Sequence, residues 1–309
     1  QVEGDRIVDA RVKTIASASA SASAARATAS SKGKPLDGAA GGTDTAFLYD
    51  TPGDDLFTGT PASASIVPNV PTPGPGQFRE AVGFDTVAAR AINGGNDRAN
   101  LFDTAGNDTI SIHPGIANFS TGGVIFLQAQ GFKFVSAKSN AGGIDSAFLF
   151  DSPQDDAFNA TPFVASLFGQ GPVPAFVSEA VGFEIVSARA STRNDLATLF
   201  DSAGNDTFTS NARTQVAVLA GPGFRNESIG FDQVFAVANA GGFDRAIMTD
   251  SAGVDTFFGR GADGRMFGAG YRYSVTMFDS VSIISPGGPA NLLDIANLQY
   301  AFARSGIWN

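Results

Sequence analysis

Apolar and polar residues alternate along short stretches of this chain, and one such stretch is Gly83–Ala91. In it, Val87 and Ala89 fall on one side of an extended backbone, and Arg90 falls on the other. A period of two predicts a half-buried strand. The alternation recurs downstream with the same apolar positions, which are Val135 and Ala137, Val186 and Ala188, Val234 and Ala236, and Val281 and Ile283. We therefore expect this side of each strand to face a core.

A second pattern joins a short strand to a sharp turn, and its fourth copy reads ATLFDSAGNDTF. The five copies begin at Ala46, Ala99, Ala147, Ala197 and Ala246. A G-G-x-D element precedes most copies, so the repeats begin near Asp44, Asp97, Asp145, Asp195 and Asp244, about fifty residues apart. The fourth repeat has Thr192-Arg193-Asn194-Asp195 instead of G-G-x-D. An internal repeat of this length determines the architecture of the whole chain.

The repeats predict an all-β fold, a parallel, right-handed β-solenoid of five repeats with about two coils each. The alternative is a β-propeller with one blade per repeat. We favour the solenoid because five blades are near the lower limit for propellers. Inserts such as Pro61–Pro75 also vary in length while the turns stay constant. Only Pro289–Arg304 could form a helix, and it could equally form a last strand.

Three segments follow from this pattern: an extended arm and hinge over residues 1–40, solenoid repeats over 41–285, and a C-terminal cap or interface segment over 286–309. In the arm, Ala16–Ala24 alternates alanine and serine strictly. This alternation fits either a flexible linker or a strand that is added to the sheet of a neighbouring subunit. The chain opens on Gln1 rather than methionine, and we expect either a processed secreted chain or a fragment prepared for purification.

The composition narrows the possible partners. The formal net charge of −10 argues against nucleic acid, which requires a basic face, and against anionic membranes. No apolar run reaches the roughly 18 residues of a membrane-spanning helix. Cysteine is absent, so disulfides cannot stabilise the fold and bound ions could. His113 is the only histidine, which excludes histidine-rich metal sites and most catalytic triads.

Paired carboxylates at the turns are the main chemical feature. The pairs are Asp50 and Asp55, Asp103 and Asp108, Asp151 and Asp156, Asp201 and Asp206, and Asp250 and Asp255. The G-G-x-D elements add Asp44, Asp97, Asp145 and Asp244. Carboxylates and backbone carbonyls at a tight turn suit a hard cation, so the pairs are candidate Ca²⁺ ligands. Aspartate also caps its own backbone in turns, which is the structural alternative.

The turn residues Gly204–Phe208 resemble the second half of the RTX calcium-binding repeat, G-G-x-G-x-D-x-U-x. The preceding glycines are replaced by Asp201–Ala203, and the motif recurs every fifty residues or so rather than every nine. Over residues 41–285 the chain more closely resembles large Gly/Asp-rich extracellular repeat proteins of planctomycete-like bacteria, whose units read L-Y-D-S-A-G-D-D-T-F. That resemblance implies an extracellular or cell-surface location and a structural role.

We therefore expect a secreted, non-enzymatic subunit of a fibre or surface matrix, which self-assembles head to tail when its arm serves as donor strand to another copy. The alternative is a calcium-stabilised adhesin or carbohydrate-binding solenoid that contacts surface polysaccharide. Its candidate aromatic column is Tyr49, Phe102, Phe150 and Phe200. The basic residues Arg90, Lys138 and Arg189 recur in register, whereas a catalytic site is normally a single break in a repeat, so no catalytic residue is assigned.

Overall fold

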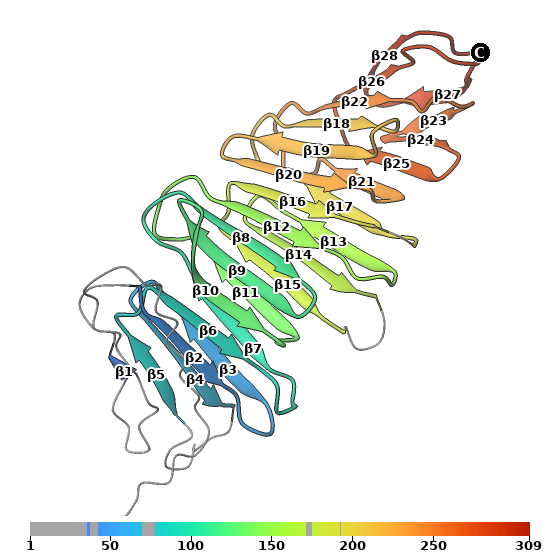
Figure 1. Ribbon diagram of the computed structural model, residues 1–309. Coiled ribbons are helices and arrows are strands. Elements are labelled where there is room, and N and C mark those ends of the chain that lie inside the picture. The colour runs from blue at the N-terminus through green and yellow to red at the C-terminus, as the bar shows by residue number, and fades with distance from the viewer. Residues whose placement is uncertain (1–35, 38–42, 70–77, 171–174, 192) are drawn as a thin grey trace, which may run out of the picture. The chain divides into compact units, whose positions relative to one another are not determined.

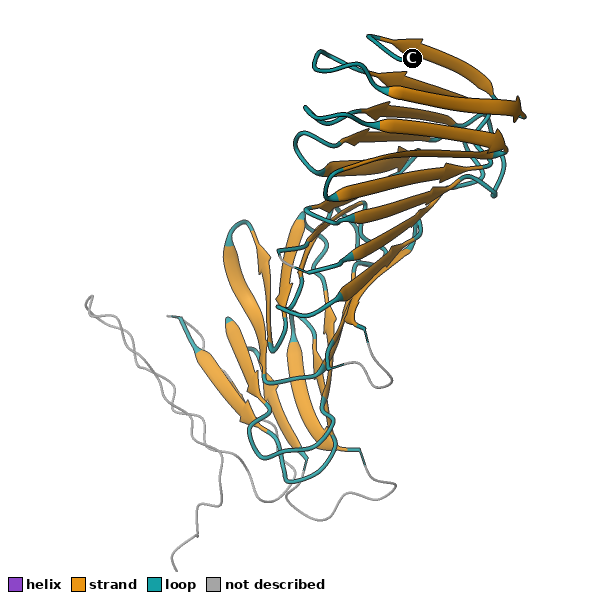
Figure 2. Ribbon diagram, turned by 90° about the vertical axis from the view of Figure 1, so that its right-hand side faces the viewer, coloured by secondary structure: helices purple, strands orange, loops and turns teal. Residues whose placement is uncertain are grey.

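A computed structural model describes residues 36–37, 43–69, 78–170, 175–191 and 193–309. Every regular element in these ranges is a strand, and none is a helix (Figures 1 and 2). Strands of successive coils pair in parallel, for example β12 with β16 and β16 with β20. This arrangement confirms the parallel β-solenoid and excludes a propeller, whose blades are separate antiparallel sheets. The predicted donor arm lies outside the described residues, apart from the two-residue strand β1 (Leu36–Asp37).

The chain divides into two compact units, residues 1–144 and 145–309. The first unit holds the first two repeats: β2 (Thr45–Tyr49), β3 (Asp55–Gly59), β4 (Ser63–Pro68), β5 (Arg79–Val82), β6 (Thr86–Arg90), β7 (Arg98–Phe102), β8 (Asp108–His113), β9 (Ile116–Thr121), β10 (Val124–Gln130) and β11 (Phe134–Lys138).

The second unit holds the other three repeats and the C-terminal strands: β12 (Ser146–Phe150), β13 (Asp156–Ala160), β14 (Val164–Gly169), β15 (Val177–Val181), β16 (Ile185–Arg189), β17 (Leu196–Phe200), β18 (Thr207–Asn211), β19 (Val216–Gly221), β20 (Phe224–Ile229), β21 (Gln233–Val237), β22 (Arg245–Thr249), β23 (Thr256–Gly261), β24 (Asp263–Gly268), β25 (Tyr271–Thr276), β26 (Ser280–Ile284), β27 (Leu292–Leu298) and β28 (Ala301–Ser305).

Each repeat contributes five strands, and the middle three form an antiparallel meander. In the third repeat, β14 pairs antiparallel with both β13 and β15, while β12 and β16 pair in parallel in the other sheet. The sequence pattern predicted two parallel coils per repeat and missed the antiparallel strand. In the first repeat, the antiparallel strand is β4, which lies within Pro61–Pro75, the segment predicted to be an insert of variable length.

The chain changes sheet three times per repeat, at β12–β13, β15–β16 and β16–β17 in the third repeat, and because three is odd, consecutive repeats begin in opposite sheets. The first strand of the fourth repeat, β17, pairs with β13 and β21, which belong to the sheet of the preceding meander. The fourth meander, β18–β20, then joins the sheet of β16 through β20. The first unit shows the same exchange, with the meanders β3–β5 and β8–β10 in different sheets. Equivalent turns of consecutive repeats therefore connect the sheets in opposite directions.

The predicted core side of the strands is confirmed. Val87, Val186 and Val234 and the alanines two residues further on are buried. Large rings fill the space between the sheets, and Phe158 and Phe231 lie 5.9 Å apart between ring centroids. Burying such a ring contributes roughly 1.5–3 kcal/mol relative to its exposed state. The core is therefore built from the strand pattern read in the sequence, supplemented by aromatic rings from the meanders and the Gly-Phe segments.

The G-G-x-D element has a steric explanation. Gly242 has φ +110°, and a Cβ placed there would lie 1.9 Å from the carbonyl oxygen of Gly204, in the turn one coil earlier. A side chain cannot fit at that distance, so the second glycine allows the two turns to stack. Gly143 meets Gly106 in the same way.

The C-terminal segment forms strands rather than the helix that was considered. β27 pairs with β23, and β28 pairs with β26. Trp308 is buried, and its indole nitrogen donates a hydrogen bond to the carbonyl oxygen of Ser305 at 3.0 Å. The tail thus folds back onto the last coil.

Candidate metal centres

Buried aspartates gather where a strand of one sheet turns into a strand of the other. In the third repeat, Asp151 follows β12, Asp156 begins β13, and Asp195 precedes β17 in the next repeat. One carboxylate oxygen from each lies within 4.8 Å of the other two. The same grouping unites Asp50, Asp55 and Asp97 in the first unit, and Asp201, Asp206 and Asp244 in the second. The sequence predicted the pairs and named Asp97 and Asp244 as further carboxylates. The structure groups these two with the pair of the preceding repeat and adds Asp195 in the same position.

Hydrogen bonds within the turn hold each carboxylate in place. In the third repeat, the backbone nitrogen and hydroxyl of Ser152 both donate to Asp156 Oδ2 at 2.9 Å. The backbone nitrogen of Asp156 donates to Asp195 Oδ1 at 2.8 Å. Asp151 Oδ2 accepts from the backbone nitrogen and hydroxyl of Ser191 at 2.7 and 2.9 Å. These contacts explain why serine or threonine stands four residues before the second aspartate of the motif, since it orders that carboxylate.

Two oxygens of this cluster have no donor. Asp156 is fully buried and Asp195 is 1% exposed, and Asp156 Oδ1 and Asp195 Oδ2 have no hydrogen-bond partner among the described residues. A buried carboxylate without compensation is costly. Burial, together with the repulsion of the neighbouring carboxylates of Asp151 and Asp156, raises the pKa of Asp195 to about 7, although the hydrogen bond from the Asp156 backbone opposes the shift.

The other clusters show the same electrostatic tendency. Burial raises the pKa of Asp55, Asp97, Asp156 and Asp244 above the ordinary aspartate value. For Asp55, the nearby Arg79 opposes this shift. A proton or a bound cation would each relieve the repulsion between such carboxylates. Buried aspartate triads could therefore hold metal ions, and their all-oxygen donor set suits a hard cation.

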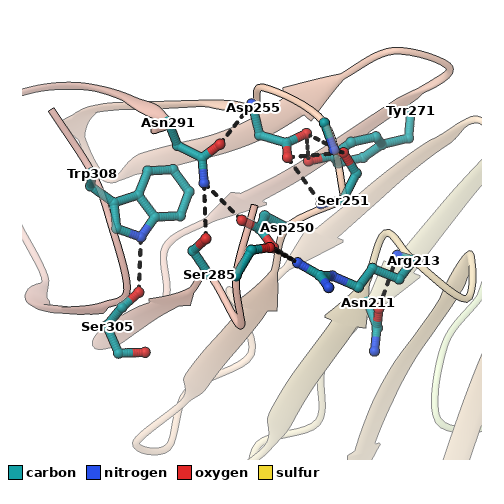
Figure 3. A network of polar contacts seen from close by, with 12 residues as sticks. Asn211, Arg213, Asp250, Ser251, Asp255, Tyr271, Ser285, Asn291, Ser305 and Trp308 are labelled. Carbon is teal, nitrogen blue, oxygen red and sulfur yellow. Dashed lines mark hydrogen bonds and ion pairs between the residues drawn. The ribbon is translucent and has the colours of Figure 1, made fainter. Parts of the chain in front are cut away.

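In the second turn, Asp103 accepts hydrogen bonds from the backbone nitrogens of Asn140 and Ala141, and Asp108 accepts from Thr104. The fifth turn differs from the three clusters. Asp250 and Asp255 lie beside Asn291, which occupies the position of the third aspartate (Figure 3).

The candidate aromatic and basic residues stand at the strand ends beside the turns, and they belong to none of the aspartate clusters. Tyr49, Phe102, Phe150 and Phe200 are half-buried, so they do not present a fully exposed aromatic face. Two of the three basic residues lie against neighbouring side chains: Arg90 donates to Gln130 Oε1 at 2.7 Å, and the Lys138 ammonium lies 5.4 Å from the ring centroid of Phe102. Arg189 is exposed.

No family model, no curated protein and no solved structure matches this chain. Among the described residues there is no helix long and apolar enough to cross a membrane. The repeat architecture and the aspartate-bearing turns are therefore the features that bear on function.

Proposed function

We propose that this protein is a secreted, non-enzymatic structural subunit that assembles head to tail into an extracellular fibre or surface matrix. Residues 5–30 of one copy would be added as a strand to the C-terminal sheet edge of another. The observation that carries the proposal is the open edge formed by β27 and β28. The resemblance of the turn motif to extracellular Gly/Asp-rich repeat proteins supports the location.

Both sheets end in strands that are paired on one side only. β27 pairs with β23 and β28 pairs with β26, and no other described strand lies beyond them. The tail shields only the start of β27, where the backbone nitrogen of Leu293 donates to the carbonyl oxygen of Asn309 at 2.7 Å. Unpaired backbone groups at such an edge can accept another strand.

The core is also incompletely covered at this end. Leu293 aligns with Phe257, and Phe302 aligns with Val281. Phe257 and Val281 are fully buried, whereas Leu293 and Phe302 are only half-buried. Ile295, which aligns with buried Gly259, is 37% exposed. An added strand would remove this apolar surface from water. Small alternating side chains such as those of Ala16–Ala24 would let the strand approach closely.

Electron microscopy with sedimentation tests the proposal. We expect filaments from the full chain and discrete particles from a chain that lacks residues 1–35. Ile295→Lys should also abolish filaments, because it places a charge at the uncovered core. Phe163→Lys is the matched control, since Phe163 is 77% exposed on a meander of the third repeat and lies outside the proposed contact. Discrete monomers of the full chain at high concentration with calcium would refute head-to-tail assembly.

A calcium-stabilised adhesin or carbohydrate-binding module is the second candidate, and the aspartate triads favour it. In that case Ca²⁺ would bind at the turns, and surface polysaccharide would be the partner. Polysaccharide binding by discrete, calcium-loaded particles would support this candidate over the fibre subunit. Loss of such binding in chelator would link it to the turns.

A further inference from the structure

The fifth turn provides an internal comparison for the aspartate triads. Its backbone follows the same plan: the backbone nitrogen of Asp255 donates to Asn291 Oδ1 at 2.9 Å, as that of Asp156 donates to Asp195 Oδ1. Asn291 therefore corresponds to Asp195, with an amide group in place of the second carboxylate oxygen. That amide donates to Asp250 Oδ2 at 2.7 Å and to Ser285 Oγ at 3.1 Å, whereas Asp195 Oδ2 has no donor (Figure 3).

A tyrosine hydroxyl satisfies a further oxygen of the fifth turn. The hydroxyl of Tyr271 donates to Asp255 Oδ1 at 2.7 Å. The corresponding ring in the third repeat is Phe176, which lies beside Gly169 as Tyr271 lies beside Gly268 and which carries no hydroxyl. Asp156 Oδ1 consequently lacks a donor there. The buried oxygens that are unsatisfied in the third turn are thus satisfied by protein groups in the fifth.

The fifth turn also carries less negative charge than the third turn. In the fifth turn, the Arg213 guanidinium lies 3.2 Å from Asp250 Oδ1, so two carboxylates and one cation leave a single negative charge. In the third turn, three carboxylates meet, and none of the ion pairs among the described residues reaches them. One bound proton would leave two negative charges, whereas a divalent cation would leave one, as in the fifth turn. Uncompensated buried charge is strongly destabilising, so the comparison favours the cation.

The type of ligand indicates the ion. One oxygen of each carboxylate lies within 4.8 Å of the other two, so an ion at their centre would lie no more than about 2.8 Å from each. Ca²⁺ binds several carboxylate oxygens at about 2.3–2.6 Å in flexible geometry, whereas Mg²⁺ usually keeps several waters and is held by only one or two carboxylates. No nitrogen or sulfur ligand belongs to the described triads, which disfavours zinc.

We propose that Asp151, Asp156 and Asp195 bind one calcium-sized divalent cation, and that the equivalent triads of the first and fourth turns do the same. In the fifth turn, Asn291, Tyr271 and Arg213 replace the ion. The inference concerns the three described triads and assigns the third ligand of each to the following repeat. It deepens the calcium role of the second candidate function and does not depend on filament assembly.

Metal analysis of the full chain tests this assignment. After equilibration with micromolar free Ca²⁺, we expect at least three bound Ca²⁺ per chain, one for each described triad. Asp195→Asn imitates Asn291, so it should fold, as judged by circular dichroism, and lose one bound Ca²⁺. Asp244→Asn provides an independent second variant in the fourth turn. Tyr271→Phe, in the turn where Asn291 replaces the third aspartate, should leave the stoichiometry of the full chain unchanged.

Several results would overturn the proposal. One is a full chain that binds no Ca²⁺, or that prefers Mg²⁺ at equal concentration. Another is an unchanged stoichiometry in both asparagine variants. A chain whose thermal midpoint is insensitive to Ca²⁺ but rises in Asp195→Asn would show that a shared proton holds the cluster. The same measurements on the chain lacking residues 1–35 separate calcium binding from assembly, since failure to form filaments should leave the stoichiometry unchanged.

Discussion

Asp195 links protonation to folding because it is buried beside two other carboxylates. Its pKa in the folded chain is raised to about 7, against an ordinary value of 3.8. Between these values the folded state of the metal-free chain binds the proton more tightly than the unfolded state. Stability from this group is therefore fully present below the ordinary pKa and is lost as the pH rises through about 7.

The resulting prediction concerns the metal-stripped protein. Its urea midpoint should fall between about pH 5 and pH 7.5, and Asp195→Asn should reduce this dependence because asparagine does not titrate. Saturating Ca²⁺ should raise the midpoint most at the higher pH, where the carboxylates are ionised. A metal-stripped chain whose midpoint rises over this interval, with no difference between wild type and Asp195→Asn, would contradict the linkage.

Gly221 and Gly169 make a second prediction at this scale, because they hold equivalent places beside Asp206 and Asp156. A Cβ on Gly221 would lie 1.5 Å from Asp206 Oδ1, whereas one on Gly169 would meet Asp156 Oδ1 at an ordinary 3.5 Å. Gly221→Ala should therefore cost about 3 kcal/mol through overpacking, and Gly169→Ala should change stability by no more than about 1 kcal/mol. Denaturation of both variants in chelator checks the difference. Equal losses of stability in the two variants would contradict the prediction, because they would show that the Asp206 side chain moves away from the added methyl group.

At the scale of the element, the last coil differs from the inner turns because side chains hold its carboxylates. Trp308, the only tryptophan, packs onto that coil and reports its integrity by fluorescence. On chelation well below the thermal midpoint, we expect the tryptophan emission to stay constant. Hydrogen exchange should accelerate at the turns between β12 and β13 and between β17 and β18.

A chain that lost tryptophan burial as soon as calcium was removed would contradict this separation. Tyr271→Phe offers a matched control, because it removes one donor from the fifth turn and leaves the triads intact. In that variant, exchange should increase in the fifth turn, in the presence or absence of calcium, while the inner turns should respond to calcium as before.

The strands show what the sequence could predict. Alternation around Val87 and Val186 identified the buried side because a strand has a fixed period of two. The antiparallel strand β14 was missed because it lies in a segment that varies between repeats and has no motif of its own. Likewise, the pair Asp151 and Asp156 could be predicted because its two residues are close in the sequence. Their grouping with Asp195 required the stacking of coils, because that residue is 39 positions away from Asp156.

For the whole molecule, the dominant property is a formal charge of −10 concentrated partly in buried turns. Repulsion of this kind destabilises a compact chain, and divalent cations bound at the triads would reduce it more effectively than monovalent salt does.

Asn291 could not be predicted from the sequence because asparagine carries no charge, and only its position against Asp250 and Asp255 reveals its role.

The odd number of connections between the two sheets in each repeat gives the chain a parity. Removing one complete repeat would exchange the sheets for everything that follows, so a strand that now ends one sheet would end the other. Removing two would restore the original assignment. Natural or engineered relatives that differ by an even number of repeats can therefore share the same pair of ends, while those that differ by an odd number cannot. Length variation in such a molecule is expected to proceed in steps of about one hundred residues.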